Sequence, residues 1–139
     1  MKLKILTFNW HEPYLCLLSR LKHDFLVVEP EIAPSHLRRW DQNMRPVPDN
    51  ATLISMAKAH KKLEEGEIDC IIAHNVKDLI SVQEYSLPKI LVFHNCLTTE
   101  IELSKEKINR NEYLKKIGPL LDDVTKVFIS KLKKDDWRI

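Results

Sequence analysis

The chain has 139 residues, of which 44% are hydrophobic and 30% charged, a composition typical of a globular protein built around one core. Its 22 basic and 20 acidic residues leave a net charge of +2, which is too small to indicate a nucleic-acid-binding surface. No apolar run approaches the ~18–20 residues that cross a bilayer. We therefore expect a single domain, with no nucleic-acid partner and no transmembrane segment.

Strands and helices alternate along the sequence, as the apolar runs, prolines and capping residues indicate. In chain order, the pattern predicts a strand at 2–9, a helix at 13–20, a strand at 23–30, a helix at 49–65, a strand at 68–73, a helix at 76–84, a strand at 89–93, a helical region at 104–121 and a strand at 126–130. We expect Asp49 or Asn50 to cap the helix at 49–65, and Gly118-Pro119 to kink or break the helical region. The alternation predicts an α/β fold, a Rossmann-like doubly wound parallel sheet of about five strands with helices on both faces.

The connection from Pro30 to Pro48 is longer than crossovers of this kind usually are. Its prolines, Pro34 among them, exclude a single helix, and the run "HLRRW" places Arg38, Arg39 and Trp40 together, with Arg45 nearby. One interpretation is a solvated surface segment with Trp40 folded back on the core. The other is a mobile binding loop, whose arginines recognise phosphate or carboxylate and whose Trp40 stacks on a sugar or rests on a lipid headgroup.

Three histidines stand at or just beyond the carboxyl ends of predicted strands, where open α/β sheets bind their ligands. With the common strand order 3-2-1-4-5, the strands at 2–9 and 89–93 are neighbours, so His11 and His94 are expected to share a pocket. The strands that end at His74 and His94 would then lie about 14 Å apart. Each histidine has a plainer interpretation too, since an imidazole at a strand end can simply bond loop carbonyls. This spread also argues against a metal site.

The other catalytic motifs are missing. Gly66 and Gly118 are the only glycines, so the sequence contains neither the glycine-rich dinucleotide-binding motif nor a phosphate-binding P-loop. No G-x-S-x-G elbow is present, and nothing singles out Ser130 as a nucleophile. Three cysteines without C-x-x-C spacing predict neither disulfides nor zinc, and the lack of a secretory signal predicts a cytoplasmic protein.

Taken in order, the strand and helix segments resemble the N-terminal half of retaining, GT-B-fold glycosyltransferases related to family 4. The resemblance covers nearly the whole chain and rests on the order and spacing of its segments. These are the turn "WHEP" and the runs "YLCLLSRL", "HDFLVVEP", "IDCIIAHN", "PKILVFHN" and "VFISKLKKDDW". In such enzymes the turn after the first strand is usually rich in glycine, so "WHEP" departs from the family pattern.

The resemblance implies a Rossmann-like domain that binds the acceptor and faces a C-terminal domain, missing from this chain, that binds a nucleotide-sugar donor. It implies that His94 hydrogen-bonds the transferred sugar as the catalytic residue, with Asn95 beside it, and that His11 and Glu12 contact a substrate. It also implies retention of the anomeric configuration without cofactor or metal, and an isolated chain without turnover. Arg38, Arg39 and Trp40 are the candidate acceptor contacts, for a sugar or lipid-linked acceptor with peripheral membrane contact.

Two other functions stay open. The first is a stand-alone Rossmann-like binding or interaction module for a small anionic ligand. The second is a small hydrolase or deaminase-like enzyme in which His11 and Glu12 act as acid and base. A strand-end edge left uncovered by a partner domain would also favour self-association of the chain.

Overall fold

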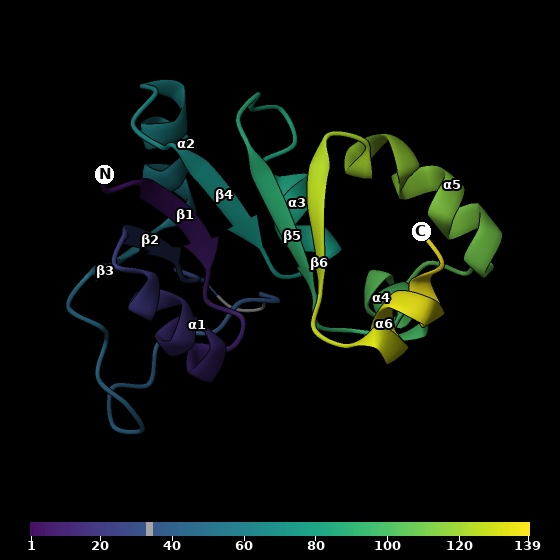
Figure 1. The fold of residues 1–139 in the computed structure, drawn as a ribbon, viewed down its shortest axis with the longest axis horizontal. Helices are drawn as coiled ribbons and strands as arrows, with labels where there is room; N and C mark the ends of the chain where they lie inside the picture. Colours follow the sequence, from purple (N-terminus) through teal and green to yellow (C-terminus); the bar gives the residue numbers. More distant parts are fainter. Residues whose placement is uncertain (33–34) are drawn as a thin grey trace. The chain divides into compact units, whose positions relative to one another are not determined.

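The structure is a computed structural model that describes residues 1–32 and 35–139 (Figure 1). Pro34, one of the loop prolines, lies outside the described residues. The elements are β1 (Lys4–Phe8), α1 (Glu12–Leu18), the 3-10 helix η1 (Ser19–Leu21), β2 (Asp24–Val28), β3 (Ala51–Ile54), α2 (Met56–Glu64), β4 (Cys70–Ala73), α3 (Val76–Ser81), β5 (Lys89–Phe93), α4 (Leu97–Ser104), α5 (Arg110–Leu121), β6 (Val124–Phe128) and α6 (Lys131–Trp137). In the part of the chain that is described, no helix has both the length and the apolar character needed to cross a membrane.

The strands form a parallel sheet in the order β3-β2-β1-β4-β5-β6, which confirms the predicted Rossmann-like α/β fold. β1 lies between β2 and β4, with Leu6 opposite Leu26 on one side and Ile71 on the other. The chain thus leaves β1 toward β2 and later returns to the other side of β1. Because parallel crossovers are right-handed, this reversal places α1 and α2 on opposite faces of the sheet. The carboxyl end of β1 is the place where such folds bind ligands.

The chain folds into two compact units. The first unit consists of Met1–Ile72 and Tyr85–Leu87, and the second of Ala73–Glu84 and Pro88–Ile139. The expectation of a single domain stays a prediction.

The first unit has a core made of strand residues that are buried on both faces of the sheet, together with one stripe from each helix. The buried strand residues are Ile5, Leu6, Phe8, Phe25, Val27, Val28, Ile54, Ile71 and Ile72. α1 begins with His11, whose Nδ1 accepts a hydrogen bond from the Tyr14 N–H at 3.3 Å, and Pro13 stands in its first turn as expected. In α2, Ala59 and Leu63 are buried at helical spacing, so this helix packs through one apolar face.

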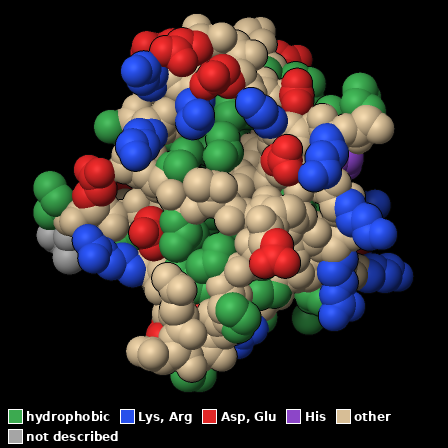
Figure 2. Space-filling view, turned by 90° about the vertical axis from the view of Figure 1, so that its left-hand side faces the viewer, with side chains coloured by type: hydrophobic (Ala, Val, Ile, Leu, Met, Phe, Trp, Pro, Cys, Tyr) green, Lys and Arg blue, Asp and Glu red, His purple; other side chains and the backbone are tan. Residues whose placement is uncertain are grey.

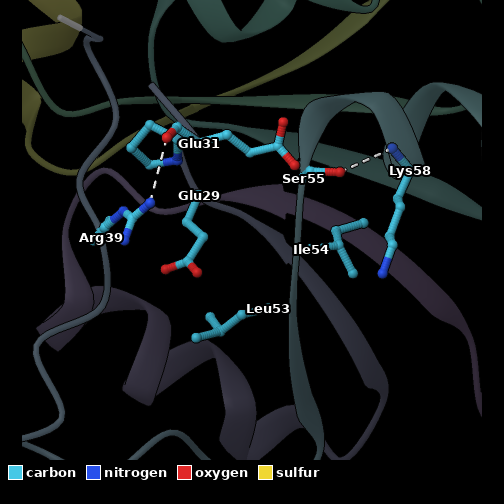
Figure 3. A pocket seen from close by; sticks show the side chains of 8 residues that line it. Glu29, Glu31, Arg39, Leu53, Ile54, Ser55 and Lys58 are labelled. Carbon is cyan, nitrogen blue, oxygen red and sulfur yellow. Dashed lines mark hydrogen bonds between the residues drawn. The ribbon is translucent and has the colours of Figure 1, made fainter. Parts of the chain in front are cut away.

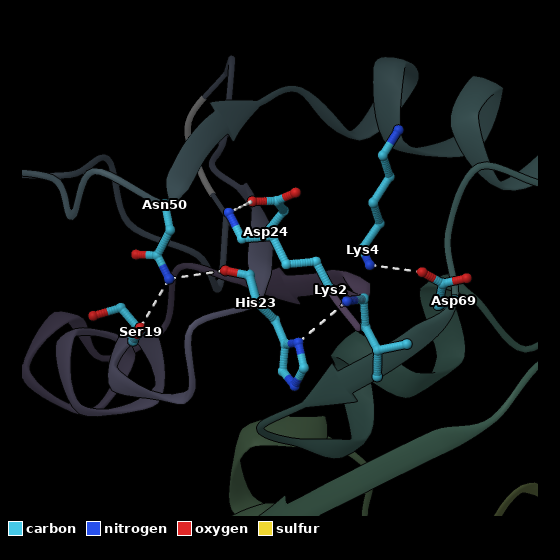
Figure 4. Close-up of polar contacts among 8 residues, drawn as sticks. Lys2, Lys4, Ser19, His23, Asp24, Asn50 and Asp69 are labelled. Atoms are coloured by element: carbon cyan, nitrogen blue, oxygen red, sulfur yellow. Dashed lines mark hydrogen bonds and ion pairs between the residues drawn. The ribbon is translucent and has the colours of Figure 1, made fainter.

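Polar contacts hold the amino ends of the strands in the first unit (Figure 4). The Asn50 Nδ2 donates to the carbonyl oxygens of Ser19 and His23, each at 2.8 Å. The Nδ1 of His23 accepts from the Leu3 N–H at 3.1 Å, and Asp69 accepts from the Lys4 N–H at 2.7 Å. These groups brace the edge of the sheet opposite to the carboxyl ends, so they belong to the scaffold.

The second unit is centred on an aromatic cluster. Phe93 of β5 stacks on Phe128 of β6 with ring centroids 4.4 Å apart, and Trp137 of α6 meets Phe93 edge-on at 4.7 Å. The other buried apolar residues of this unit include Leu91, Val92, Leu97, Ile117 and Leu121. The indole of Trp137 is 1% exposed, so α6 is anchored to the sheet by its last helical residue.

The predicted helix at 49–65 is wrong in its first quarter. Residues Ala51–Ile54 form β3, which pairs with β2 at the edge of the sheet, and α2 starts only after Ser55. The Ser55 Oγ caps the helix by accepting the Lys58 N–H at 3.2 Å, a role that was assigned to Asp49 or Asn50. Residues 51–54 form a strand because they pair with β2, which is distant in sequence. The helical spacing of apolar residues gives no information about such a long-range contact.

Two further predictions are corrected in the second unit. The helical region predicted at 104–121 is helical over α5, whereas α4 precedes it and residues 105–109 separate the two helices. Lys105 is in a left-handed conformation at the end of α4, and an Asn109 capping box begins α5. α5 continues through Pro119, so the helix is not broken at Gly118-Pro119. Proline has no N–H to donate to the carbonyl four residues earlier, so one helical hydrogen bond is missing there. α6 was not predicted, because "KLKKDDW" offers only Leu132 and Trp137 as apolar residues.

Candidate functional site

Polar residues gather at strand ends in both units. In the first unit, the segment after β1 and the loop before β3 line a cavity of about 430 Å³, which we call the arginine pocket. Its polar lining consists of His11, Glu12, Arg38, Arg39, Asp41 and Arg45. In the second unit, four buried or half-buried residues that follow β4 and β5, with Glu100 of α4, form a group that we call the histidine cluster. Its members are His74, Asn75, Asp78, His94 and Glu100.

The arginine pocket owes its shape to Asn9, a residue for which the sequence suggested no role. Asn9 is fully buried directly after β1, and its backbone N–H donates to the Val28 carbonyl at 2.8 Å. Its carbonyl accepts the Arg38 N–H at 2.9 Å, while its Nδ2 donates to the Arg38 carbonyl at 2.6 Å. This two-way pairing fixes the loop to the end of β1. The only sequence signal was a polar residue at the end of an apolar run.

Glu12 has a structural role as well. Its Oε1 accepts the Asp41 N–H at 2.7 Å, and the Asp41 Oδ1 in turn accepts the Asn43 N–H at 3.0 Å. The carboxylate of Glu12 therefore anchors the tight turn at 41–44 from the first turn of α1. This contact weighs against the predicted role of Glu12 as an acid or base.

Trp40 is folded back on the core, as one of the two interpretations of the loop expected. Its side chain is 7% exposed, its Nε1 donates to the Arg45 carbonyl at 3.0 Å, and its backbone N–H donates to Glu29 at 3.1 Å. A ring held in this way has no open face on which a sugar can stack. The adjacent Arg38 and Arg39 are exposed and do line the pocket.

The arginine pocket offers more positive than negative charge, with three guanidinium groups against the carboxylates of Glu12 and Asp41. The Nε of Arg45 is buried and has no hydrogen-bond partner in the described part of the chain. An unpaired buried donor costs the folded chain about 1–3 kcal/mol. Figure 2 shows basic and acidic side chains scattered over one face of the molecule, with hydrophobic side chains between them.

The histidine cluster brings together the two histidines that the sequence placed apart. The Nδ1 of His74 lies 3.1 Å from the Nε2 of His94, and the ring centroids are 5.2 Å apart. His74 is 2% exposed, whereas His94 is half-buried. A neutral imidazole donates from one nitrogen and accepts at the other, so this contact ties the tautomers of the two rings together. His74 thereby orients the ring of His94.

Two buried carboxyl groups complete the histidine cluster. Asp78 is fully buried, and its Oδ2 accepts the His74 N–H at 3.0 Å, while its own N–H donates to the Asn75 Oδ1 at 2.8 Å. Burial raises the pKa of Glu100 above its ordinary value. The nearby charge of Asp78 adds to that effect, against hydrogen bonds from Asn95 and from the Val76 backbone. Neither carboxyl was predicted as a site residue.

α6 fixes the turn that follows His94. The Nε1 of Trp137 donates to the Asn95 carbonyl at 2.9 Å, and Asp136 accepts the Leu97 N–H at 2.8 Å. Arg110 of α5 pairs with Asp136 at 3.5 Å, so this carboxylate is held from a second side. The side chain of Asn95, a predicted substrate contact, donates to Glu100 at 3.3 Å. Ser130 caps α6, which gives it a structural role.

The predicted strand order is wrong, and with it the predicted spacing of the histidines. Both edges of β1 are taken, by β2 and by β4, so β5 is not its neighbour. The additional strand β3 occupies the outer position that the prediction gave to the strand ending at His74. That strand is β4, and His74 reaches His94 directly.

Among residues 1–32 and 35–139, no group of three or more His, Cys, Asp or Glu side chains is arranged to hold a metal ion. Gly66 ends α2 and Gly118 lies inside α5, so neither glycine stands at the carboxyl end of a strand. Cys70 of β4 is half-buried, and burial together with the charge of Asp69 raises the pKa of its thiol. No protein-family model matches the chain, and neither a curated protein nor a solved structure matches it.

Proposed function

We propose that this chain forms the acceptor-binding domain of a retaining glycosyltransferase, in which a second Rossmann-like domain binds the nucleotide-sugar donor. The observation that carries the proposal is the placement of His94. Its imidazole stands at the carboxyl end of a parallel strand, is half-buried, and is held by a fully buried histidine. This is the placement that a group needs in order to hydrogen-bond the transferred sugar, which is the role implied by the resemblance to such enzymes.

His94 contributes by position. Sugar transfer depends on holding the reacting groups in one geometry and on stabilising the charge that develops on the leaving diphosphate. A ring already oriented by His74 loses little conformational freedom when it donates to or accepts from a sugar hydroxyl group. The turn 95–97 is held by Trp137 and Asp136, so the backbone around His94 is also constrained.

The arginine pocket supplies the acceptor side of the proposal. Guanidinium groups bind phosphate and carboxylate through two parallel hydrogen bonds and stay charged at all physiological pH values. Arg38, Arg39 and Arg45 line one cavity, so three positive charges surround one ligand site. The pocket therefore suits an acceptor that carries a phosphate or carboxylate group, whether free or attached to a lipid.

The donor nucleotide is assigned to another domain, because nucleotide phosphates are usually cradled by glycine-rich turns at strand ends. Here the turn after β1 reads Trp10-His11-Glu12-Pro13, and the side chain of Glu12 is occupied by Asp41. Neither glycine of the chain is near such a turn. The proposal needs no cofactor in this chain.

Two measurements test the proposal. First, glucose 6-phosphate should bind the chain at low salt, and Arg38→Ala with Arg39→Ala should weaken binding at least about tenfold, since charged hydrogen bonds contribute ~1.5–3 kcal/mol each. Arg20→Ala, an exposed arginine outside the pocket, is the control. Calorimetry or NMR titration gives the constants. Equal affinity of the double variant and the control would remove the pocket from the proposal.

Second, the chain by itself should release no nucleotide diphosphate from nucleotide sugars, whatever acceptor is added. In the protein that joins it to a donor-binding domain, His94→Ala should lower kcat about ten- to a hundredfold, as expected for the loss of one hydrogen bond in the transition state. Thr98→Ala, an exposed change in the same unit, serves as the control. Turnover by the isolated chain would overturn the domain assignment.

A stand-alone binding module for a small anionic ligand is the second candidate. It is favoured by one observation, namely that the arginine pocket is complete within the first unit. If glucose 6-phosphate binds no better than inorganic phosphate, and no two-domain protein containing this chain transfers sugar, this second function is the better description.

A further inference from the structure

A second cavity lies beside the loop, at the carboxyl ends of β2 and β3 (Figure 3). It has a volume of about 220 Å³ and we call it the β2–β3 pocket. Its polar lining consists of Glu29, Glu31, Arg39, Ser55 and Lys58, with Ile54 and Leu53 as apolar neighbours. No role was assigned to this pocket from the sequence, in which residues 49–65 were expected to form one helix without β3.

Arg39 lines both cavities of the first unit. Its Nη2 donates to the Glu31 carbonyl at 3.3 Å, a contact that holds the guanidinium over the loop and is drawn in Figure 3. Arg39 therefore forms a shared wall, and the two cavities adjoin at this residue.

The two pockets differ in charge. The arginine pocket has three guanidinium groups against two carboxylates, whereas the β2–β3 pocket sets Arg39 and Lys58 against Glu29 and Glu31. A balanced lining does not favour a second anion. It offers both hydrogen-bond acceptors and hydrogen-bond donors. In Figure 3 the acceptor, the Glu29 carboxylate, lies between the donors Arg39 and Lys58.

The groups in the β2–β3 pocket are also held in place. One oxygen of Glu29 accepts the Trp40 N–H at 3.1 Å, so the carboxylate is anchored to the buried part of the loop. Ser55 is fixed by its capping contact with Lys58, while Ile54 contributes an apolar wall. Carboxylate, ammonium and hydroxyl groups around a small apolar surface match the neighbouring hydroxyl groups and the C–H face of a sugar ring.

We propose that the β2–β3 pocket is a second subsite for the same ligand, and that it binds a neutral sugar ring linked to the anionic group held in the arginine pocket. The inference rests on the proposed function in one respect, since it takes the arginine pocket as the site of an anionic acceptor. It adds that the acceptor is at least a disaccharide in size, with its charge on one unit and free hydroxyl groups on the next.

The experiment compares glucose 6-phosphate with three disaccharides that contain it, trehalose 6-phosphate, sucrose 6-phosphate and maltose 6′-phosphate, by calorimetry on the full chain at low salt. At least one disaccharide phosphate should bind about fivefold more tightly than glucose 6-phosphate, as one or two additional hydrogen bonds predict. Lys58→Ala should reduce that advantage to about one. Lys61→Ala, an exposed lysine of the same helix outside the pocket, should preserve it.

Arg39→Ala should weaken glucose 6-phosphate and the disaccharide phosphate together, because Arg39 belongs to both pockets. If none of the disaccharide phosphates binds more tightly than glucose 6-phosphate, or if Lys58→Ala leaves the advantage intact, the second subsite is refuted while the arginine pocket stands. If glucose 6-phosphate itself fails to bind, the proposed function fails first, and the two failures are thereby distinguished.

Discussion

At the scale of single residues, the structure places polar side chains in the interior next to the strand ends. Glu100 is 6% exposed in the second unit, and Asn9 is fully buried in the first, where its Oδ1 has no partner among the described residues. Arg45 adds an unpaired buried Nε. Most buried polar groups in folded proteins are hydrogen-bonded, and the exceptions concentrate at functional sites. Both orphan atoms belong to residues that shape or line the arginine pocket.

Glu100 makes stability depend on pH in a defined direction. Its pKa is raised by burial, so the folded chain binds this proton up to a higher pH than the unfolded chain does. The free energy of unfolding therefore falls as the pH rises from the ordinary pKa through the raised one. Glu100→Gln should abolish that fall, so that the variant equals the wild type near pH 4 and is more stable at pH 8. Urea denaturation at intervals across this range measures it, and parallel curves would contradict it.

Replacing Arg45 should change the free energy of unfolding and the affinity for an anionic ligand in opposite directions. Replacing it by Met removes the buried, unpaired Nε while keeping an unbranched side chain of similar length. Because a buried donor without a partner costs about 1–3 kcal/mol, we expect Arg45→Met to raise the free energy of unfolding by about 1 kcal/mol without ligand. It should at the same time weaken glucose 6-phosphate. Urea denaturation and calorimetry test both parts, and a destabilised variant would mean that the charge stabilises the unliganded chain.

At the scale of elements, α6 is the least predictable and one of the more consequential. Only its buried Trp137 and half-buried Lys133 and Asp136 face inward, and two of these three bond the turn after His94. The helix thus supports the histidine cluster through backbone groups of the turn. α2 takes part in the β2–β3 pocket more directly, because its residue Lys58 lines the cavity.

Trp137→Phe tests the support from α6. The change preserves an aromatic ring against Phe93 but removes the hydrogen bond from Nε1 to the Asn95 carbonyl. We expect a loss of about 1–3 kcal/mol in the free energy of unfolding, from the unpaired carbonyl and the smaller ring. Leu132→Ala is a matched change in the same helix, at a side chain that is 76% exposed, and should cost under about 0.5 kcal/mol. Similar losses in the two variants would deny α6 this role.

At the scale of the whole molecule, the sequence predicts one domain, while the chain folds into two compact units. Chains of this size usually unfold in a single cooperative transition. The fold class is the firmest result at this scale, because every described strand pair is parallel and helices separate most of the strands along the chain.

Hydrogen exchange tests whether the chain is one cooperative domain. The slowest amides of β1 and β2 belong to the first unit, and those of β5 and β6 to the second. If the domain is cooperative, both groups should open with the same free energy, equal to that of global unfolding by urea. Two distinct opening free energies, with one unit exchanging well below the global value, would show that the units unfold independently.

The sequence by itself determined the α/β class, five of the six strands and the presence of polar side chains at strand ends. These follow from local patterns, since buried strands such as 89–93 are continuous apolar runs whatever surrounds them. Local patterns did not determine β3, whose four residues became a strand only by pairing with β2. They also could not place His74 beside His94, because strand order depends on which distant segments close on each other. Trp40 was likewise ambiguous, since an indole suits a core and a binding surface equally well, and only its burial and its bond to Arg45 assigned it to the core.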